Sequence, residues 1–93
     1  MVICIALLLA ASPAREPARQ VLKSNRCDAC HDRVVSSENP RALAIYDLQD
    51  DDWPARMTNA QLPKLLGRLR SASAADRKVV REFIDAELRN RSR

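Results

Sequence analysis

Apolar residues recur at helical spacing near both ends of the chain. Over residues 16–25, Ala18, Val21 and Leu22 fall at positions i, i+3 and i+4, and this spacing predicts a first helix. The stretch after Ser73 is rich in charge, yet it carries one apolar stripe, made of Val79, Val80, Phe83, Ile84 and Leu88. Ser73 followed by Asp76 matches a capping box, which predicts where this last helix begins.

The middle of the chain predicts shorter elements. Serine, asparagine and proline cluster in residues 32–40, which is typical of a loop, and a short helix is expected over 40–48. A further helix is expected over 61–70, because leucines recur there at i, i+3, i+4 and i+7. Pro63 fits only in its first turn, so this helix does not extend far back toward the centre of the chain.

One more helix is predicted between these elements. Asp52 has the chemistry of an N-cap, and Pro54 suits the first turn that follows. A helix over 52–58 would place Trp53 and Met57 on one face. The chain holds one glycine and three aromatic residues, and it has no run rich in β-branched residues and bounded by turn signals. The pattern therefore predicts an all-α fold of three to five short helices.

The N-terminal residues differ from the rest. Val2 to Ala11 form an apolar run that is shorter than the roughly 20 residues a membrane span needs. Small residues around Ala14 offer a cleavage site, so we expect a signal peptide over 1–14, export, and a mature domain over 15–93 with no transmembrane span. No lysine or arginine precedes the run, unlike an ordinary signal peptide, and a buried N-terminal helix is the alternative.

The chain is basic, with 16 Lys and Arg against 12 Asp and Glu and a net charge of +4. Both signs are mixed along the sequence, residues 50–52 form an acidic run, and no predicted helix has a purely basic face. Nucleic acid is therefore not an expected partner. The positive balance favours an acidic protein partner or an anionic surface instead.

Cys27-Asp28-Ala29-Cys30-His31 is a C-x-x-C-H motif, the attachment signature of c-type haem. Two thiols at this spacing can each add across a vinyl group on one edge of the porphyrin, and the adjacent histidine then reaches the iron. A zinc site needs four ligands, and the mature chain offers three. A disulfide between Cys27 and Cys30 is the other alternative, but it leaves His31 without a role.

With this motif behind a short helix and an apolar-striped helix at the C-terminus, the chain resembles the small class I cytochromes c. The resemblance implies a cytochrome c-like domain around one covalent haem c, with His31 as an iron ligand and a methionine opposite it. Met57 is the methionine available in the mature chain, and Trp53 to Met57 is similar to a Trp-x-x-Arg-Met stretch of small single-haem domains. Alternatively, Met57 fills the core and the iron is five-coordinate or binds water. Lys64 is a more distant candidate ligand.

The resemblance implies further roles. Family members bind the haem propionates through arginine, tryptophan or tyrosine, and Arg41, Tyr46, Trp53 and Arg56 have that chemistry. A backbone carbonyl orients the iron-binding histidine, and Pro40 is the nearest proline to supply it. The family places a glycine where its terminal helices cross. Here the first helix has none, so Ala18 or another small residue would have to take its place against an aromatic ring such as Phe83.

The expected function is single-electron transfer between redox proteins, most naturally in a bacterial periplasm, without enzymatic activity of its own. Two alternatives remain open at this point. An open iron position would suit a haem-based sensor, a gas-binding protein or a small peroxidase-like enzyme. A haem subunit docked on a larger oxidoreductase would have the same sequence features.

Overall fold

The computed structural model describes residues 12–92, and the predicted signal peptide lies largely outside them. Within the described chain every regular element is a helix, so the all-α prediction is confirmed. The five helices are α2 (Arg15–Ser24), α3 (Asp28–His31), α4 (Pro40–Ile45), α5 (Lys64–Arg68) and α6 (Ala74–Arg91). No helix among the described residues is long and apolar enough to cross a membrane.

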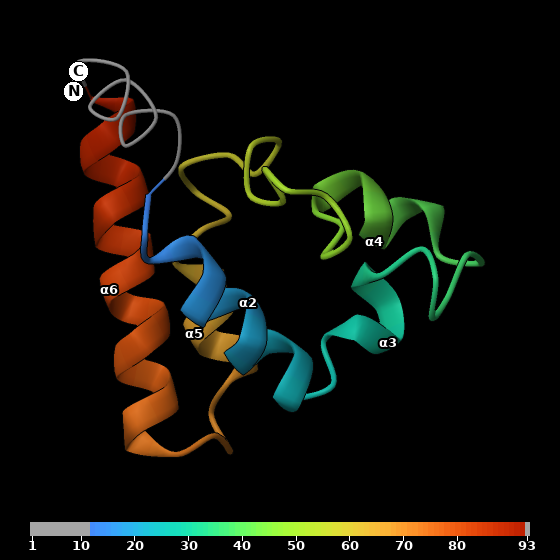
Figure 1. Cartoon of the computed structure of the whole chain (residues 1–93), viewed down its shortest axis with the longest axis horizontal. Helices are drawn as coiled ribbons and strands as arrows, with labels where there is room; N and C mark the ends of the chain where they lie inside the picture. Colours follow the sequence, from blue (N-terminus) through green and yellow to red (C-terminus); the bar gives the residue numbers. More distant parts are fainter. Residues whose placement is uncertain (1–11, 93) are drawn as a thin grey trace, which may run out of the picture.

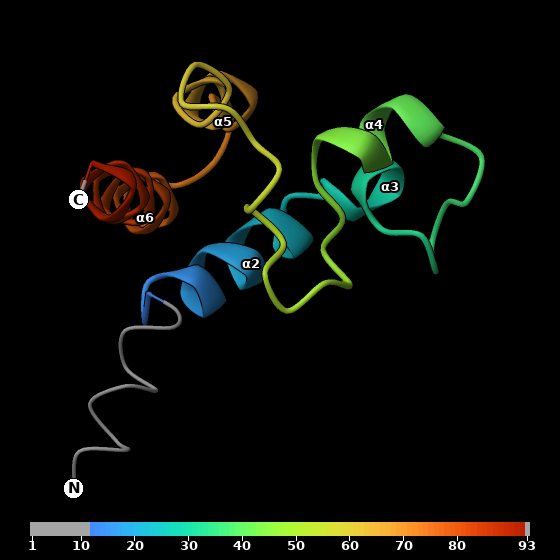
Figure 2. The ribbon, with the colours of Figure 1, turned by 90° about the horizontal axis from the view of Figure 1, so that it is seen from above.

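Figure 1 shows α6 as the longest element, with α2 and α5 packed against it and α3 and α4 on the far side of α2. Figure 2 shows α2 running across α6, which is seen there end on. We call α2, α5 and α6 the helical frame, and residues 25–63 the loop half. The loop half carries the C-x-x-C-H motif and both short helices α3 and α4.

The predicted apolar faces of the two long helices form the core of the frame. From α2 the residues Ala18, Val21 and Leu22 are buried, and from α6 the residues Val80, Phe83 and Ile84. Ala18 and Phe83 are both fully covered. Phe83 also stacks on Trp53 of the loop half, with ring centroids 4.9 Å apart.

A buried ion pair joins the same two helices. Arg15 of α2 donates from Nε and Nη2 to the two carboxylate oxygens of Glu87, at 2.5 and 3.1 Å. Glu87 is 1% exposed, so its charge needs this partner to remain buried. Arg91, one turn further along α6, adds a second cation at 3.9 Å from Glu87.

The predicted boundaries of the frame helices hold to within a few residues. Ser73 caps α6, because its hydroxyl accepts a hydrogen bond from the backbone N–H of Asp76 at 3.0 Å. At the other end of the frame, α2 begins one residue earlier than predicted and ends one earlier. The helix expected over 61–70 is shorter, since Pro63 forms its N-cap and α5 covers only Lys64–Arg68.

The helix predicted over 52–58 is wrong. Residues 51–56 form consecutive turns, with backbone hydrogen bonds such as Ala55 N–H to Asp52 O at 2.8 Å and Met57 N–H to Pro54 O at 3.0 Å. Arginine side chains from elsewhere bind carbonyls of this segment, and these bonds replace part of the helical hydrogen bonding. The helix expected over 40–48 likewise ends at Ile45.

A tight helix end directs the chain from α2 into the motif. Arg26 has a φ of 66°, the left-handed conformation that follows many helices. Its N–H binds Lys23 O at 3.1 Å, and the N–H of Cys27 reaches back to Leu22 O at 2.9 Å. This pair of bonds is a Schellman motif, in which glycine is the usual left-handed residue. The turn places Cys27 against the core of the frame.

Candidate functional site

The C-x-x-C-H motif folds into a single helical turn. Cys27 is the N-cap of α3, and its carbonyl accepts the backbone N–H of His31 at 3.0 Å. Both cysteines are free thiols, Cys27 half-buried and Cys30 exposed. Burial raises the pKa of the Cys27 thiol, and hydrogen bonding with the Tyr46 hydroxyl offsets only part of that rise. At neutral pH Cys27 is therefore a protonated, sheltered thiol.

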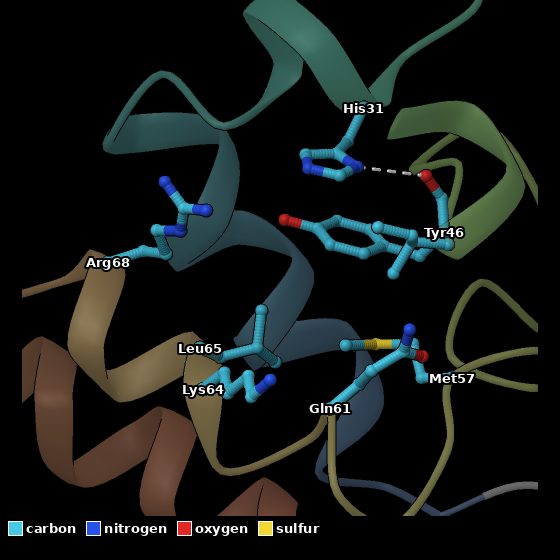
Figure 3. Close-up of a pocket in the computed structure, with 8 residues that line it drawn as sticks. His31, Tyr46, Met57, Gln61, Lys64, Leu65 and Arg68 are labelled. Atoms are coloured by element: carbon cyan, nitrogen blue, oxygen red, sulfur yellow. Dashed lines mark hydrogen bonds between the residues drawn. The ribbon is translucent and has the colours of Figure 1, made fainter. Parts of the chain in front are cut away.

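Backbone carbonyls orient the His31 ring by binding its Nδ1 atom, so that the Nε2 atom is left without a partner among the described residues. The Nδ1 atom lies 2.9 Å from Ala42 O and 3.2 Å from Tyr46 O, and since both partners are acceptors, Nδ1 carries the proton and donates to them. Figure 3 shows the bond to Tyr46 O. In the neutral imidazole this tautomer leaves the lone pair on Nε2, the form in which histidine binds a metal.

The expectation that Pro40 supplies the orienting carbonyl is wrong, because the carbonyls that bind His31 belong to Ala42 and Tyr46. Pro40 lies in the first turn of α4, whereas the end of that helix faces His31.

A polar latch fixes the segment after His31 to the segment after Tyr46. Leu48 N–H binds His31 O at 2.7 Å, and the Gln49 amide donates to both oxygens of Asp32 at 3.0 Å. In the reverse direction, Arg33 donates to the carboxylate of Asp47 at 2.9 Å. These bonds hold the backbone on both sides of the His31–Tyr46 pair.

Both carboxylates of the latch are 3–4% exposed and ionised. Burial alone would raise the pKa of Asp32, but hydrogen bonds from Gln49 and from two backbone N–H groups outweigh it and hold the pKa below its usual value. The pKa of Asp47 is lowered in the same way, against burial, by the backbone N–H of Gln49 and by Arg33. The latch is therefore weakened by acid.

The Tyr46 ring stacks on the imidazole of His31. The two rings are 6° from parallel with centroids 3.8 Å apart, and Tyr46 meets Trp53 edge to face at 5.6 Å. Tyr46 is 4% exposed, and burial raises the pKa of its hydroxyl strongly. Figure 3 shows the ring between His31 and the Met57 side chain.

Met57 and His31 line one pocket of about 120 Å³, the space of a few water molecules. Met57 is 3% exposed, and Figure 3 shows its thioether across the Tyr46 ring from His31. The structure thus brings together the two residues that the sequence proposed as axial ligands. The remaining lining residues are Ile45, Tyr46, Gln61, Lys64, Leu65 and Arg68.

Of the four residues expected to bind propionates, only Tyr46 lines this pocket. Trp53 donates its indole N–H to Arg15 O at 3.3 Å instead. Arg56 donates to Leu43 O at 3.1 Å, and Arg41 is exposed on α4. These side chains stabilise the fold or face solvent rather than the pocket.

The positive charges at the pocket come from α5. Lys64 and Arg68 both line it. The sequence indicates Lys64 only as a less favoured candidate iron ligand, and it indicates no role for Arg68. They are four residues apart, so they share one face of the helix. The leucine pattern of the 61–70 stretch contained this signal, because Leu65 and Leu69 orient α5 toward the core and leave Lys64 and Arg68 at its edge.

The donor set fits a c-type haem. It contains two free thiols at C-x-x-C spacing, a histidine with one nitrogen free, and a thioether on the facing wall. The space between the donors is smaller than the several hundred Å³ of an ordinary ligand pocket, because the Tyr46 ring stands in it. A haem bound by both His31 and Met57 therefore requires Tyr46 to move aside.

Two further observations concern the other chemistries of the motif. Within residues 12–92 no group of three or more His, Cys, Asp or Glu side chains is placed to hold a metal ion. Cys27 and Cys30 carry free thiols and are not joined in a disulfide.

Comparison of this chain with protein-family models, with curated proteins and with solved structures gives no match.

Proposed function

We propose that the chain is an exported c-type cytochrome that binds one haem covalently and transfers single electrons between redox proteins of the bacterial periplasm. The observation that carries the proposal is the state of His31: its Nδ1 donates to Ala42 O, which leaves Nε2 free in the pocket that Met57 also lines. A histidine held in this way is typical of a metal ligand.

In this proposal Cys27 and Cys30 form the thioethers, and His31 and Met57 bind the iron. The bound haem supplies a one-electron iron couple, whose potential a thioether ligand and burial both raise. The side chains of Ile45 and Leu65 provide apolar walls of the pocket. Lys64 and Arg68 bring two positive charges to the same pocket, suited to the carboxylates of a haem edge.

One observation favours a second candidate function. Tyr46, rather than Met57, is in direct contact with His31. If Tyr46 keeps its place and Met57 does not bind the iron, the iron would keep an open position, and the protein would be a haem-based sensor, gas-binding protein or peroxidase-like enzyme. The two candidates share the same haem attachment and differ in the identity of the residue on the sixth position.

The experiment is to express the chain together with a c-type haem maturation system and to compare the wild type with Met57→Leu and with Cys27→Ser/Cys30→Ser. Leucine conserves the volume of methionine and removes the sulfur. Covalent haem in the wild type, absent from the double serine variant, supports the attachment. A weak far-red band of the oxidised wild type that disappears in Met57→Leu supports Met57 as ligand and electron transfer as function.

Other results redirect the assignment. A high-spin wild type that binds carbon monoxide readily favours the sensor or enzyme. If no covalent haem forms, the proposal fails, and thiol chemistry at Cys27 and Cys30 must be reconsidered.

A further inference from the structure

We propose that Arg91, in the last turn of α6, is the positioning residue that sets where the Met57 side chain stands. The inference concerns the loop itself, and its consequence for an iron ligand rests on the proposed function. Arg91 lies 34 residues beyond Met57 in sequence. It does not line the pocket, so it acts through the backbone of Met57.

The contacts converge on a few atoms of one turn. The Nη1 group of Arg91 donates to Met57 O at 2.5 Å and to the Asn59 side-chain oxygen at 3.1 Å. Its Nη2 group donates to Pro54 O at 2.8 Å. One planar guanidinium therefore ties the carbonyls at both ends of the turn over residues 54–57, which a single-point donor such as lysine cannot do in the same geometry.

The turn over residues 54–57 needs a hydrogen-bond donor from another part of the chain, because it lacks the regular hydrogen bonds of a helix. Residues 51–56 are consecutive turns, and Met57 and Thr58 follow without regular structure. Pro54 also has no N–H to give. Carbonyls buried in such a segment require partners, and the hydrogen bond to Met57 O comes from Arg91.

The guanidinium is itself held by the frame. Its Nε lies 3.9 Å from an oxygen of Glu87, which is buried and paired to Arg15 of α2. The Arg91 side chain retains 24% of its exposure, and the Glu87 side chain 2%. The position of the Met57 backbone is thus fixed by contacts with the α2–α6 frame, and not only by the loop in which the residue lies.

Hydrogen–deuterium exchange on the purified full chain tests the loop, with haem attached or without. The variants are Arg91→Gln and Arg91→Lys, and Arg89→Gln, an exposed arginine two residues earlier on α6, is the matched control. We expect the Met57 amide, bonded to Pro54 O, and the Gln61 amide, bonded to Thr58 O, to exchange roughly tenfold faster in Arg91→Gln. Arg91→Lys should recover part of this protection, and Arg89→Gln should match the wild type.

The far-red band of the oxidised haem protein tests the consequence for Met57. On heating, the band should disappear in Arg91→Gln at a lower temperature than in the wild type, while far-UV circular dichroism still reports intact helices. Val79→Ala is the stability control, because it removes core contacts of α6 and leaves Arg91 unchanged. In that variant, loss of the band should coincide with unfolding.

The outcomes are separable. Unchanged amide exchange and an unchanged band in Arg91→Gln would overturn the role of Arg91 and leave the proposed function in place. Loss of band and helix together, as in Val79→Ala, would reduce Arg91 to a stabilising residue and overturn the inference as well. A wild type without covalent haem or without the band removes the ligand role, whereas the exchange result still decides whether Arg91 fixes the loop.

Discussion

The two parts of this protein are stabilised by different forces. In the helical frame, α2 and α6 bury apolar faces against each other, and a single buried ion pair between Arg15 and Glu87 joins them. In the loop half, the helices are at most six residues long, and side chains bind backbone carbonyls and N–H groups from one segment to the next. Apolar burial has little directional preference, whereas hydrogen bonds fix positions to within a few tenths of an ångström.

Because of this difference, the stability of the whole chain and the exact positions of the candidate ligands depend on different interactions. Both parts contribute large side chains to the apolar core, Phe83 and Leu22 from the frame and Trp53, Leu48 and Leu62 from the loop half, but the loop half also holds the candidate ligands in place by polar bonds that each contribute little net stability. Changes in the frame should therefore lower the free energy of unfolding of the whole chain, and changes in the latch should open only the loop half.

The largest expected effect is in the frame. Phe83→Ala removes a fully buried ring that packs in the α2–α6 core and stacks on Trp53, so it should lower the free energy of unfolding by about 3–5 kcal/mol. Urea denaturation followed by circular dichroism measures the loss. Arg81→Ala, exposed on the same helix, should change it by less than about 0.5 kcal/mol. An equal loss in both variants would contradict the division of roles.

A smaller and local effect is expected in the latch. Asp32→Asn removes the charge that accepts bonds from Gln49, Val34 and Val35, at a cost of about 1–3 kcal/mol. Amide exchange at Val34 and Val35 should quicken, while the α6 amide of Phe83 keeps its protection. Equal loss of protection in both regions would show that the two halves unfold as one unit.

Acid should open the loop half before the frame. The carboxyls of Asp32 and Asp47 have pKa values held below the ordinary 3.8, so their contribution is fully present above that pH and is lost as the pH falls through the lower, folded pKa. Below about pH 4, exchange at Val34 should therefore rise ahead of exchange in α6. In Asp32→Asn this pH dependence should be reduced, and an unchanged dependence would refute the assignment to the latch.

The smallest effect concerns the turn that joins the two halves. Arg26 has a left-handed φ of 66°, which costs a residue with a side chain roughly 1 kcal/mol relative to glycine. Arg26→Gly should raise the free energy of unfolding by about that amount, measured by urea titration. The matched control is Ser24→Gly, inside α2, which should lower it by about 0.5–1 kcal/mol. A loss in both variants would mean that the Arg26 side chain stabilises the turn.

The same division explains what could be predicted from the sequence. The stripe after Ser73 and its cap predict the existence and the start of α6, because periodicity and capping are local signals. The C-x-x-C-H motif predicts that Cys27, Cys30 and His31 lie together. The structure also brings Met57 to the pocket of His31, although the helix predicted over 52–58, which would place Met57 on one face with Trp53, is wrong.

What the sequence could not predict depends on distant partners. The stacking of Tyr46 on His31, the latch and the Arg91 contacts each join residues that only the folded chain brings near. Thirteen arginines are present in the chain, and nothing local distinguishes Arg91 from its neighbour Arg89. The distinction arises because the turn of α6 presents Arg91, and not Arg89, to the Pro54–Met57 turn.

The hydrogen bonds from Arg19 and Arg91 also determine which positions of residues 48–57 can accept substitutions. Arg19 donates to the carbonyls of Leu48 and Asp51, and Arg91 to those of Pro54 and Met57. Every residue type offers the same carbonyl, so the shape of this segment depends little on which side chains it carries. Its exposed positions, Asp51 and Ala55 among them, are open to substitution. Arg19 and Arg91 are not, because their side chains bind the backbone carbonyls of this segment.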